Sequence, residues 1–305
     1  MSDIPRIALT LHCVSLRVYL SITQRLGKKT IYGWAQVRGV KPKIYMNSLS
    51  GIQHTEVLYG IHPVLEALKA GRRDFFEVYI AQDKASKRLE KVAALAVSFN
   101  IPVKNTKPMQ LKSMAGTDLH QGIGARVSRY PLAGLSDIID NLKSAAASNF
   151  LLLLDNVIDP NNLGAIIRTA LCVGVTGVII PQDRSAYPTP SVSRASAGAL
   201  EHIRLAQVTN MVNTTKDLKK RGMWIIGMDK SANKSIFSSD LSGSVAIVIG
   251  GEGKGIRALV KKNCDYLISI PQTGPVDSLN ASVAGAVVMY EAFRQRKFAQ
   301  SAGKC

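Results

Sequence analysis

The sequence predicts an α/β protein, in which a parallel, doubly wound sheet follows a smaller α/β domain. Two observations carry this prediction. Five short stretches in the second half of the 305-residue chain are continuously apolar, which is typical of strands covered on both faces. Segments of helical periodicity separate them, as in parallel sheets with crossover helices. The expected strands are residues 150–155, 177–180, 223–227, 245–249 and 266–270.

The smaller domain is expected at residues 54–128, where helix and strand patterns alternate over a short length. Residues 64–68 and 89–99 have helical spacing, residues 76–80 alternate like a strand, and a further strand starts at residues 101–103. Residues 129–149 contain Pro131, Gly134 and a run of small residues, which favours a linker with one helix. The larger domain then spans residues 150–298.

Residues 1–53 differ from the rest in composition, with eight Lys or Arg and a single acid, Asp3. Two interpretations stay open. An acid-poor leader resembles an organellar transit peptide, or the segment is an upstream extension and Met46 is the true start. Either way we expect a basic, poorly ordered extension.

The net charge of +18 predicts a polyanionic partner. Subtracting the seven net charges of residues 1–53 still leaves +11. The sequence has no uninterrupted apolar stretch of about 18 residues, so it gives no sign of a membrane-spanning helix. Within the smaller domain the basic residues expected to contact phosphates, or else to form a solvated helix face, are Lys69, Arg72, Arg73, Lys84, Lys87, Arg88 and Lys91.

The cysteines and histidines do not form the patterns of a metal site. The four cysteines stand at positions 13, 172, 264 and 305 with no C-x-x-C pair, and the five histidines are scattered. We therefore expect no metal, no disulfide framework, and reduced thiols in a cytoplasmic setting.

Three loops after expected strands carry the candidate functional residues, at the sheet edge where parallel α/β proteins bind ligands. The first loop contains Asn162 and leads into a helix that carries Arg168. The simpler interpretation is that Asn162 caps this helix and that Arg168 is a solvated side chain, with no catalytic role for either. The second contains four glycines in residues 250–255, which indicates close backbone approach. It matches neither a Walker loop nor G-x-G-x-x-G, which disfavours a phosphate cradle. The third carries Ser278 and Asn280 at a helix entrance, where capping is again the simpler interpretation.

Taken together and in this order, Asn-x-Gly-x-x-x-Arg, Gly-Gly-Glu-Gly-x-Gly and Ile-Pro…Ser-Leu-Asn-x-Ser resemble the SpoU (TrmH-like) branch of the SPOUT RNA methyltransferases. The resemblance covers about residues 57–297 and is strongest to the bacterial 23S rRNA (guanosine-2'-O-)-methyltransferases. Residues 59–63 and 120–123 look like that family's RNA-binding domain, which is similar to ribosomal protein L30e. Ala281 departs from the family, where a branched apolar residue is usual.

The resemblance implies a deep trefoil knot, a homodimer with residues 279–296 in its interface, and S-adenosyl-L-methionine as cofactor. Gly250, Ile270 and Leu279 would hold this methyl donor through backbone groups. The substrate would be a ribose 2'-hydroxyl, of a guanosine in 23S ribosomal RNA. A tRNA methyltransferase and a non-catalytic ribosome assembly factor are the alternatives.

The family account makes Arg168 the base, which the high pKa of arginine opposes. Two roles for Arg168 therefore stay open: a base assisted by an adjacent phosphate, or a clamp on the phosphate beside the ribose. The resemblance implies that Asn162, Glu252, Ser278 and Asn280 orient Arg168 and the ribose.

Overall fold

The computed structural model describes residues 55–82, 86–142, 149–275 and 278–302, all of which belong to one compact unit. These residues form two sheets, one of four strands and one of six. The expectation for residues 1–53 falls outside the described residues. None of the described helices is long and apolar enough to span a bilayer.

The four-stranded sheet is mixed and has the order β1-β4-β2-β3. β4 pairs antiparallel with β1 and β2, whereas β2 and β3 are parallel. Two of these strands, β1 and β4, were not among the sequence predictions. β4 was hidden by Gly124, which is needed because a Cβ there would lie 2.9 Å from Leu111 Cδ1. The elements are β1 (Thr55–Tyr59), α2 (Ile61–Ala70), β2 (Phe75–Ala81), α3 (Lys87–Ser98), β3 (Val103–Thr106), α4 (Pro108–Ala115) and β4 (Ile123–Ser128).

The six-stranded sheet is parallel throughout, in the order β10-β8-β9-β5-β6-β7, which confirms the predicted parallel sheet. All five expected strands are present. The sixth, β7, was not predicted because it is only four residues long and includes the polar Gln207. The strands are β5 (Phe150–Asp155), β6 (Gly177–Pro181), β7 (Leu205–Val208), β8 (Trp224–Met228), β9 (Val245–Gly250) and β10 (Tyr266–Ile268).

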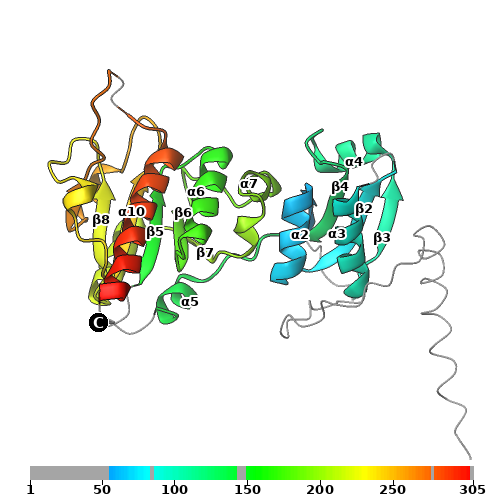
Figure 1. Cartoon of the computed structure of the whole chain (residues 1–305), viewed down its shortest axis with the longest axis horizontal. Coiled ribbons are helices and arrows are strands. Elements are labelled where there is room, and N and C mark those ends of the chain that lie inside the picture. Colours follow the sequence, from blue (N-terminus) through cyan, green and yellow to red (C-terminus); the bar gives the residue numbers. More distant parts are fainter. Residues whose placement is uncertain (1–54, 83–85, 143–148, 276–277, 303–305) are drawn as a thin grey trace, which may run out of the picture. The chain divides into compact units, whose positions relative to one another are not determined.

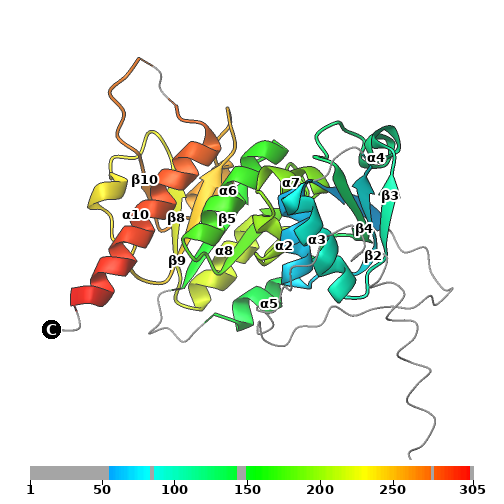
Figure 2. The same cartoon turned by 45° about the vertical axis from the view of Figure 1, so that its right-hand side comes forward.

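Helices cover both faces of this sheet, which explains why its strands are continuously apolar. Leu152 and Leu154 of β5 belong to one buried cluster, and Leu151 and Leu153 belong to another on the opposite face. α6 and α10 pack on the first face, where they lie side by side (Figure 1), and α5, α8 and α9 contribute to the second (Figure 2). The helices are α5 (Leu135–Asp140), α6 (Pro160–Cys172), α7 (Pro190–Ala195), α8 (Met211–Lys220), α9 (Ala258–Lys262) and α10 (Ala281–Ala302), with 3-10 turns η1 (Ala199–Glu201) and η2 (Ile236–Ser238).

Because the sheet is parallel, the carboxyl ends of its strands share one edge. Asp155, the last residue of β5, pairs with Gly250, the last residue of β9. The first two candidate loops therefore begin as neighbours. The third loop follows β10, which is joined to β9 through β8.

Candidate functional site

A cavity of about 720 Å³ opens at the carboxyl ends of β8, β9 and β10, beside the start of α10. This volume suits a ligand of nucleoside size, since small-molecule sites commonly measure about 300–1,000 Å³. Apolar side chains and the backbone of the glycine loop form much of its wall. The lining includes Ile249, Ile268, Ile270, Leu279, Ala281, Ala284, residues 250–255, Asp229, Lys230, Ser231, Ser278 and Asn280.

The three candidate loops meet at a hydrogen-bonded cluster of Asn162, Glu252 and Asn280. The Glu252 carboxylate accepts hydrogen bonds from the Nδ2 atoms of Asn162, at 3.1 Å, and of Asn280. Asn280 Nδ2 also donates to Asn162 Oδ1 at 3.0 Å. The Glu252 side chain thus fixes two amides from different loops.

Asn162 does not cap its helix, and that interpretation of the sequence was wrong. α6 begins at Pro160, and its N-cap is Asp159, whose carboxylate accepts from the backbone N–H groups of Asn161 and Asn162. Asn162 lies two residues inside the helix, with its side chain buried against Glu252. Because Asp159 already provides the cap, the Asn162 amide is available for the cluster.

Asn280 does cap its helix and also joins the cluster. Its Oδ1 accepts from the backbone N–H groups of Ser282, at 2.9 Å, and Val283, at 3.4 Å. Its Nδ2 is directed at Glu252. The amide therefore uses its acceptor for the helix and its donor for the cluster, so capping does not prevent Asn280 from taking part in the cluster.

The glycine loop closes tightly upon itself. A Cβ at Gly250 would lie 2.3 Å from the carbonyl carbon of Gly255, and one at Gly251 would lie 1.8 Å from the backbone oxygen of Asn156. The close backbone approach inferred from the glycines is thus to the chain's own backbone. A larger residue at Gly250 would disrupt the loop before it reached any ligand.

Asp155 holds both ends of this loop, and it was not among the sequence-based candidates. Its backbone oxygen accepts from Gly251 N at 2.8 Å. Its carboxylate, which is fully buried, accepts from Arg257 N at 2.8 Å and Arg257 Nε at 2.7 Å. The available signal was an acid at the end of an otherwise apolar strand, because an unpaired charge is costly to bury there.

The structure places most of the predicted residues at the cavity but leaves two, Asn162 and Arg168, out of its wall. Gly250, Glu252, Ser278 and Asn280 line it, as do Ile270 and Leu279. Arg168 is exposed and does not line it. Within the described part of the chain, no hydrogen bond or ion pair holds its guanidinium. Arg168 follows Asn162 by six residues on α6, about 9 Å along the axis.

The cavity wall carries a second carboxylate, Asp229. Burial tends to raise its pKa, but hydrogen bonds from Lys261 and Ser231 outweigh this and lower the pKa below its ordinary value. Asp229 therefore stays ionised at neutral pH. Across the described ranges, no group of three or more His, Cys, Asp or Glu residues could hold a metal ion.

Two family models match this chain. The description of one is the SpoU rRNA Methylase family, and it covers residues 149–290. The other describes an RNA 2'-O ribose methyltransferase substrate-binding domain and covers residues 57–133. The two matches therefore include both sheets.

Individual relatives agree with these matches. A putative TrmH family tRNA/rRNA methyltransferase, YacO of Bacillus subtilis, is 40% identical over 80% of this chain and 97% of its own length. The 23S rRNA (guanosine-2'-O-)-methyltransferase RlmB of Pectobacterium atrosepticum is 40% identical over 79% of this chain and 99% of its own. The crystal structure of the SpoU methyltransferase AviRb from Streptomyces viridochromogenes, in complex with AdoMet, has a TM-score of 0.68 at 24% identity. It covers 80% of this chain and 91% of AviRb, and shows that the fold is shared.

Proposed function

The chain belongs to the SpoU rRNA methylase family, and from this premise we propose that it methylates a ribose 2'-hydroxyl of RNA with S-adenosyl-L-methionine as donor. The observation that carries the proposal is the Asn162–Glu252–Asn280 cluster beside the cavity. It joins one residue from each of the three sequence motifs. The relatives named as acting on guanosine in 23S rRNA make that nucleotide the proposed substrate.

The cavity suits such a donor in size and in its apolar lining. Apolar side chains, including Ile249 and Ile268, offer a slot for a purine, and backbone groups of residues 250–255 lie along the wall. Gly250, Ile270 and Leu279 are the proposed backbone contacts. Asp229 and Glu252 line the cavity together with Lys230 and Lys254, so its wall carries charges of both signs.

When bound, the donor supplies a methyl group on a positively charged sulfur, and the protein must orient the attacking hydroxyl and help remove its proton. We assign orientation to Asn162, Glu252, Ser278 and Asn280. Arg168 is the proposed partner of the ribose or its phosphate. Arg168 lies six residues after Asn162, so the two side chains lie on different faces of α6. Both roles, assisted base and phosphate clamp, stay open.

We further propose the family's homodimer, through α10. Val283 and Tyr290 are seven residues apart, so they share one helix face, and they are 48% and 53% exposed. Apolar side chains exposed along one face fit burial by a second copy. A trefoil knot around the cavity, an L30e-like substrate-binding domain and a cytoplasmic location complete the proposal.

The test combines donor binding with product mapping. Calorimetry with the full chain should show binding of S-adenosylmethionine. The purified protein should also transfer methyl groups from this donor to 23S rRNA isolated from a strain that lacks the gene. Sites of 2'-O-methylation are then mapped with and without the gene. Methylation of tRNA alone would favour the tRNA alternative, and RNA binding without donor binding would favour an assembly factor.

A further inference from the structure

Two adjacent arginines that follow α2, Arg72 and Arg73, do not face solvent. The sequence predicted that they contact RNA phosphates or form a solvated helix face. Arg73 is only 2% exposed, and Arg72 is bound to backbone carbonyl groups. Lys87, Arg88 and Lys91 of α3 are exposed, and they stay candidates for RNA contact. Lys84 lies outside the described residues.

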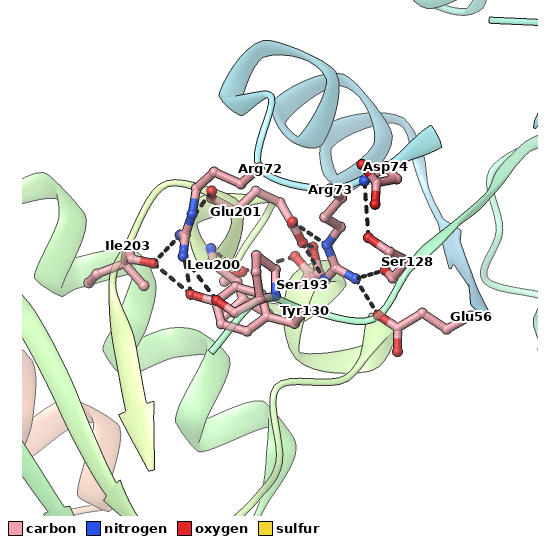
Figure 3. Close-up of polar contacts among 12 residues, drawn as sticks. Glu56, Arg72, Arg73, Asp74, Ser128, Tyr130, Ser193, Leu200, Glu201 and Ile203 are labelled. Atoms are coloured by element: carbon pink, nitrogen blue, oxygen red, sulfur yellow. Dashed lines mark hydrogen bonds and ion pairs between the residues drawn. The ribbon is translucent and has the colours of Figure 1, made fainter. Parts of the chain in front are cut away.

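Arg73 lies in a buried ion pair with Glu201, which belongs to the segment between α7 and β7. Its Nε and Nη2 donate to the two oxygens of Glu201 at 2.6 and 3.0 Å (Figure 3). Its Nη1 donates to Glu56 and to the Ser128 carbonyl. Both side chains of the Arg73–Glu201 pair are at most 1% exposed. A bidentate pair of this kind fixes direction as well as distance.

Glu201 also accepts a hydrogen bond from the domain of the six-stranded sheet, to which it belongs. Ser193 of α7 donates its hydroxyl to Glu201 Oε1 at 2.7 Å and is fully buried. The guanidinium and carboxylate thus have partners on both sides. A buried charged network that is fully hydrogen-bonded tolerates few alternative geometries.

Arg72 makes a second set of contacts across the same junction. It donates to the carbonyls of Ile203, Glu201 and Pro131, and to the hydroxyl of Tyr130. The Tyr130 hydroxyl donates in turn to Ile203 O at 2.6 Å, and the Arg72 guanidinium lies 5.2 Å from the Tyr130 ring centroid (Figure 3). Arginine suits this site because its planar fork reaches several acceptors at once.

α2 also packs directly against the same segment. The Glu66 carboxylate accepts a hydrogen bond from His202 Nε2 at 2.8 Å. A Cβ at Gly198 would lie 2.7 Å from Glu66 Cβ, so the two backbones approach too closely for a side chain there. Ionic and steric contacts therefore act on the same few residues.

The segment that receives these contacts leads to the candidate site. α6, which carries Asn162 and Arg168, packs against both α7 and η1. The contact between α6 and α7 is close, since a Cβ at Gly164 would lie 2.5 Å from Ala195 Cβ. The substrate-binding domain is therefore anchored, through η1 and α7, to the part of the fold that contains α6.

We propose that Arg72, Arg73 and Glu201 are positioning residues, which hold the substrate-binding domain in one orientation so that RNA bound there presents a single ribose to the methyl-transfer site. The proposal rests on the proposed function for its substrate, but the junction itself is independent of it. Substrate selection then depends on the fixed separation between the RNA-contacting surface and the cavity. Neither domain alone would define the modified nucleotide.

The experiment compares Arg72→Met and Glu201→Gln with the wild type in the full chain. Lys220→Met is the matched control, because its ion pair with Asp217 lies within α8 and is exposed. We expect kcat/KM on structured rRNA to fall at least tenfold in both variants, with methylation appearing at additional riboses. Affinities for donor and for RNA should stay within twofold of wild type, and a short RNA that reaches only the cavity should be methylated normally.

A second measurement does not depend on methylation. Spin labels at Lys91→Cys and the native Cys172, with the other cysteines replaced, should give a narrow distance distribution in wild type and a broad one in Arg72→Met and Glu201→Gln. Unchanged distributions, or unchanged selectivity with broadened distributions, would overturn the proposal. If the wild type methylates no RNA but the distance distributions still broaden in both variants, the proposed function is wrong. The role of these residues in fixing the domain orientation is then still supported.

Discussion

The interaction between Asp155 and Arg257 should stabilise the glycine loop, and Arg257→Ala tests this directly. The substitution removes the hydrogen bond from Arg257 Nε to Asp155 and the ion pair at 2.6 Å. The backbone hydrogen bond from residue 257 to Asp155 survives. A fully buried carboxylate is then left with a single partner.

The expected loss follows from burial. Removing one member of a fully buried pair costs about 3–5 kcal/mol, because the remaining charge is uncompensated. The Arg257 side chain is 34% exposed, so water screens part of the interaction and we expect about 2–3 kcal/mol. At roughly 2–4 °C per kcal/mol for a unit of this size, the melting temperature should fall by roughly 4–12 °C. Loosening of residues 251–256 should also weaken donor binding roughly tenfold, which is about 1.4 kcal/mol.

The assay is a double-mutant cycle, with thermal unfolding and donor calorimetry on each variant. Asp155→Asn in the Arg257→Ala background removes the unpaired charge, so the double variant should be more stable than the sum of the two losses predicts, by about 1–2 kcal/mol. Arg221→Ala is the control, since its pair with Asp140 is half exposed and should contribute less than about 1 kcal/mol. Additive losses, or donor affinity unaffected by Arg257→Ala, would refute the reasoning.

Three other outcomes are expected. Arg168→Ala should abolish methyl transfer with donor affinity near wild type, because Arg168 does not line the cavity. Arg168→Lys should keep partial activity if the residue is a clamp and shift the pH–rate profile if it is a base. Wild-type turnover in Arg168→Ala would show that neither role applies. Gly251→Ala should eliminate donor binding in calorimetry, since its Cβ would collide with the Asn156 backbone, whereas Gly274→Ala should be silent because nothing lies within 4 Å; equal affinities would contradict the loop geometry. Burial raises the pKa of the Cys264 thiol to about 11. At pH 8 this thiol should therefore react with iodoacetamide far more slowly than the exposed Cys172, as peptide mass spectrometry can measure. Comparable rates would show that Cys264 is accessible.

The strands and loop motifs of the larger sheet could be predicted because their signals are local. Residues 150–155 form β5 as expected, since a continuously apolar run needs no knowledge of distant partners to indicate a strand covered on both faces. The glycine density of residues 250–255 likewise indicated a tight backbone, although the partners that it approaches are the loop itself and the backbone of Asn156.

Only the tertiary structure decided which side chains meet. Asn162 lies 90 residues before Glu252 and 118 before Asn280, so no local pattern could show that they meet. The cap, in contrast, had a local signal in Asp159 followed by Pro160, which the prediction of Asn162 as the cap missed. The sequence also does not show which charged residues are buried. Arg73 stands in a basic segment like exposed residues such as Lys69, but it is buried because Glu201, 128 residues away, supplies a carboxylate that pairs with it. Composition determined that this protein carries an excess of cations, and packing decided which of them stay free to meet RNA.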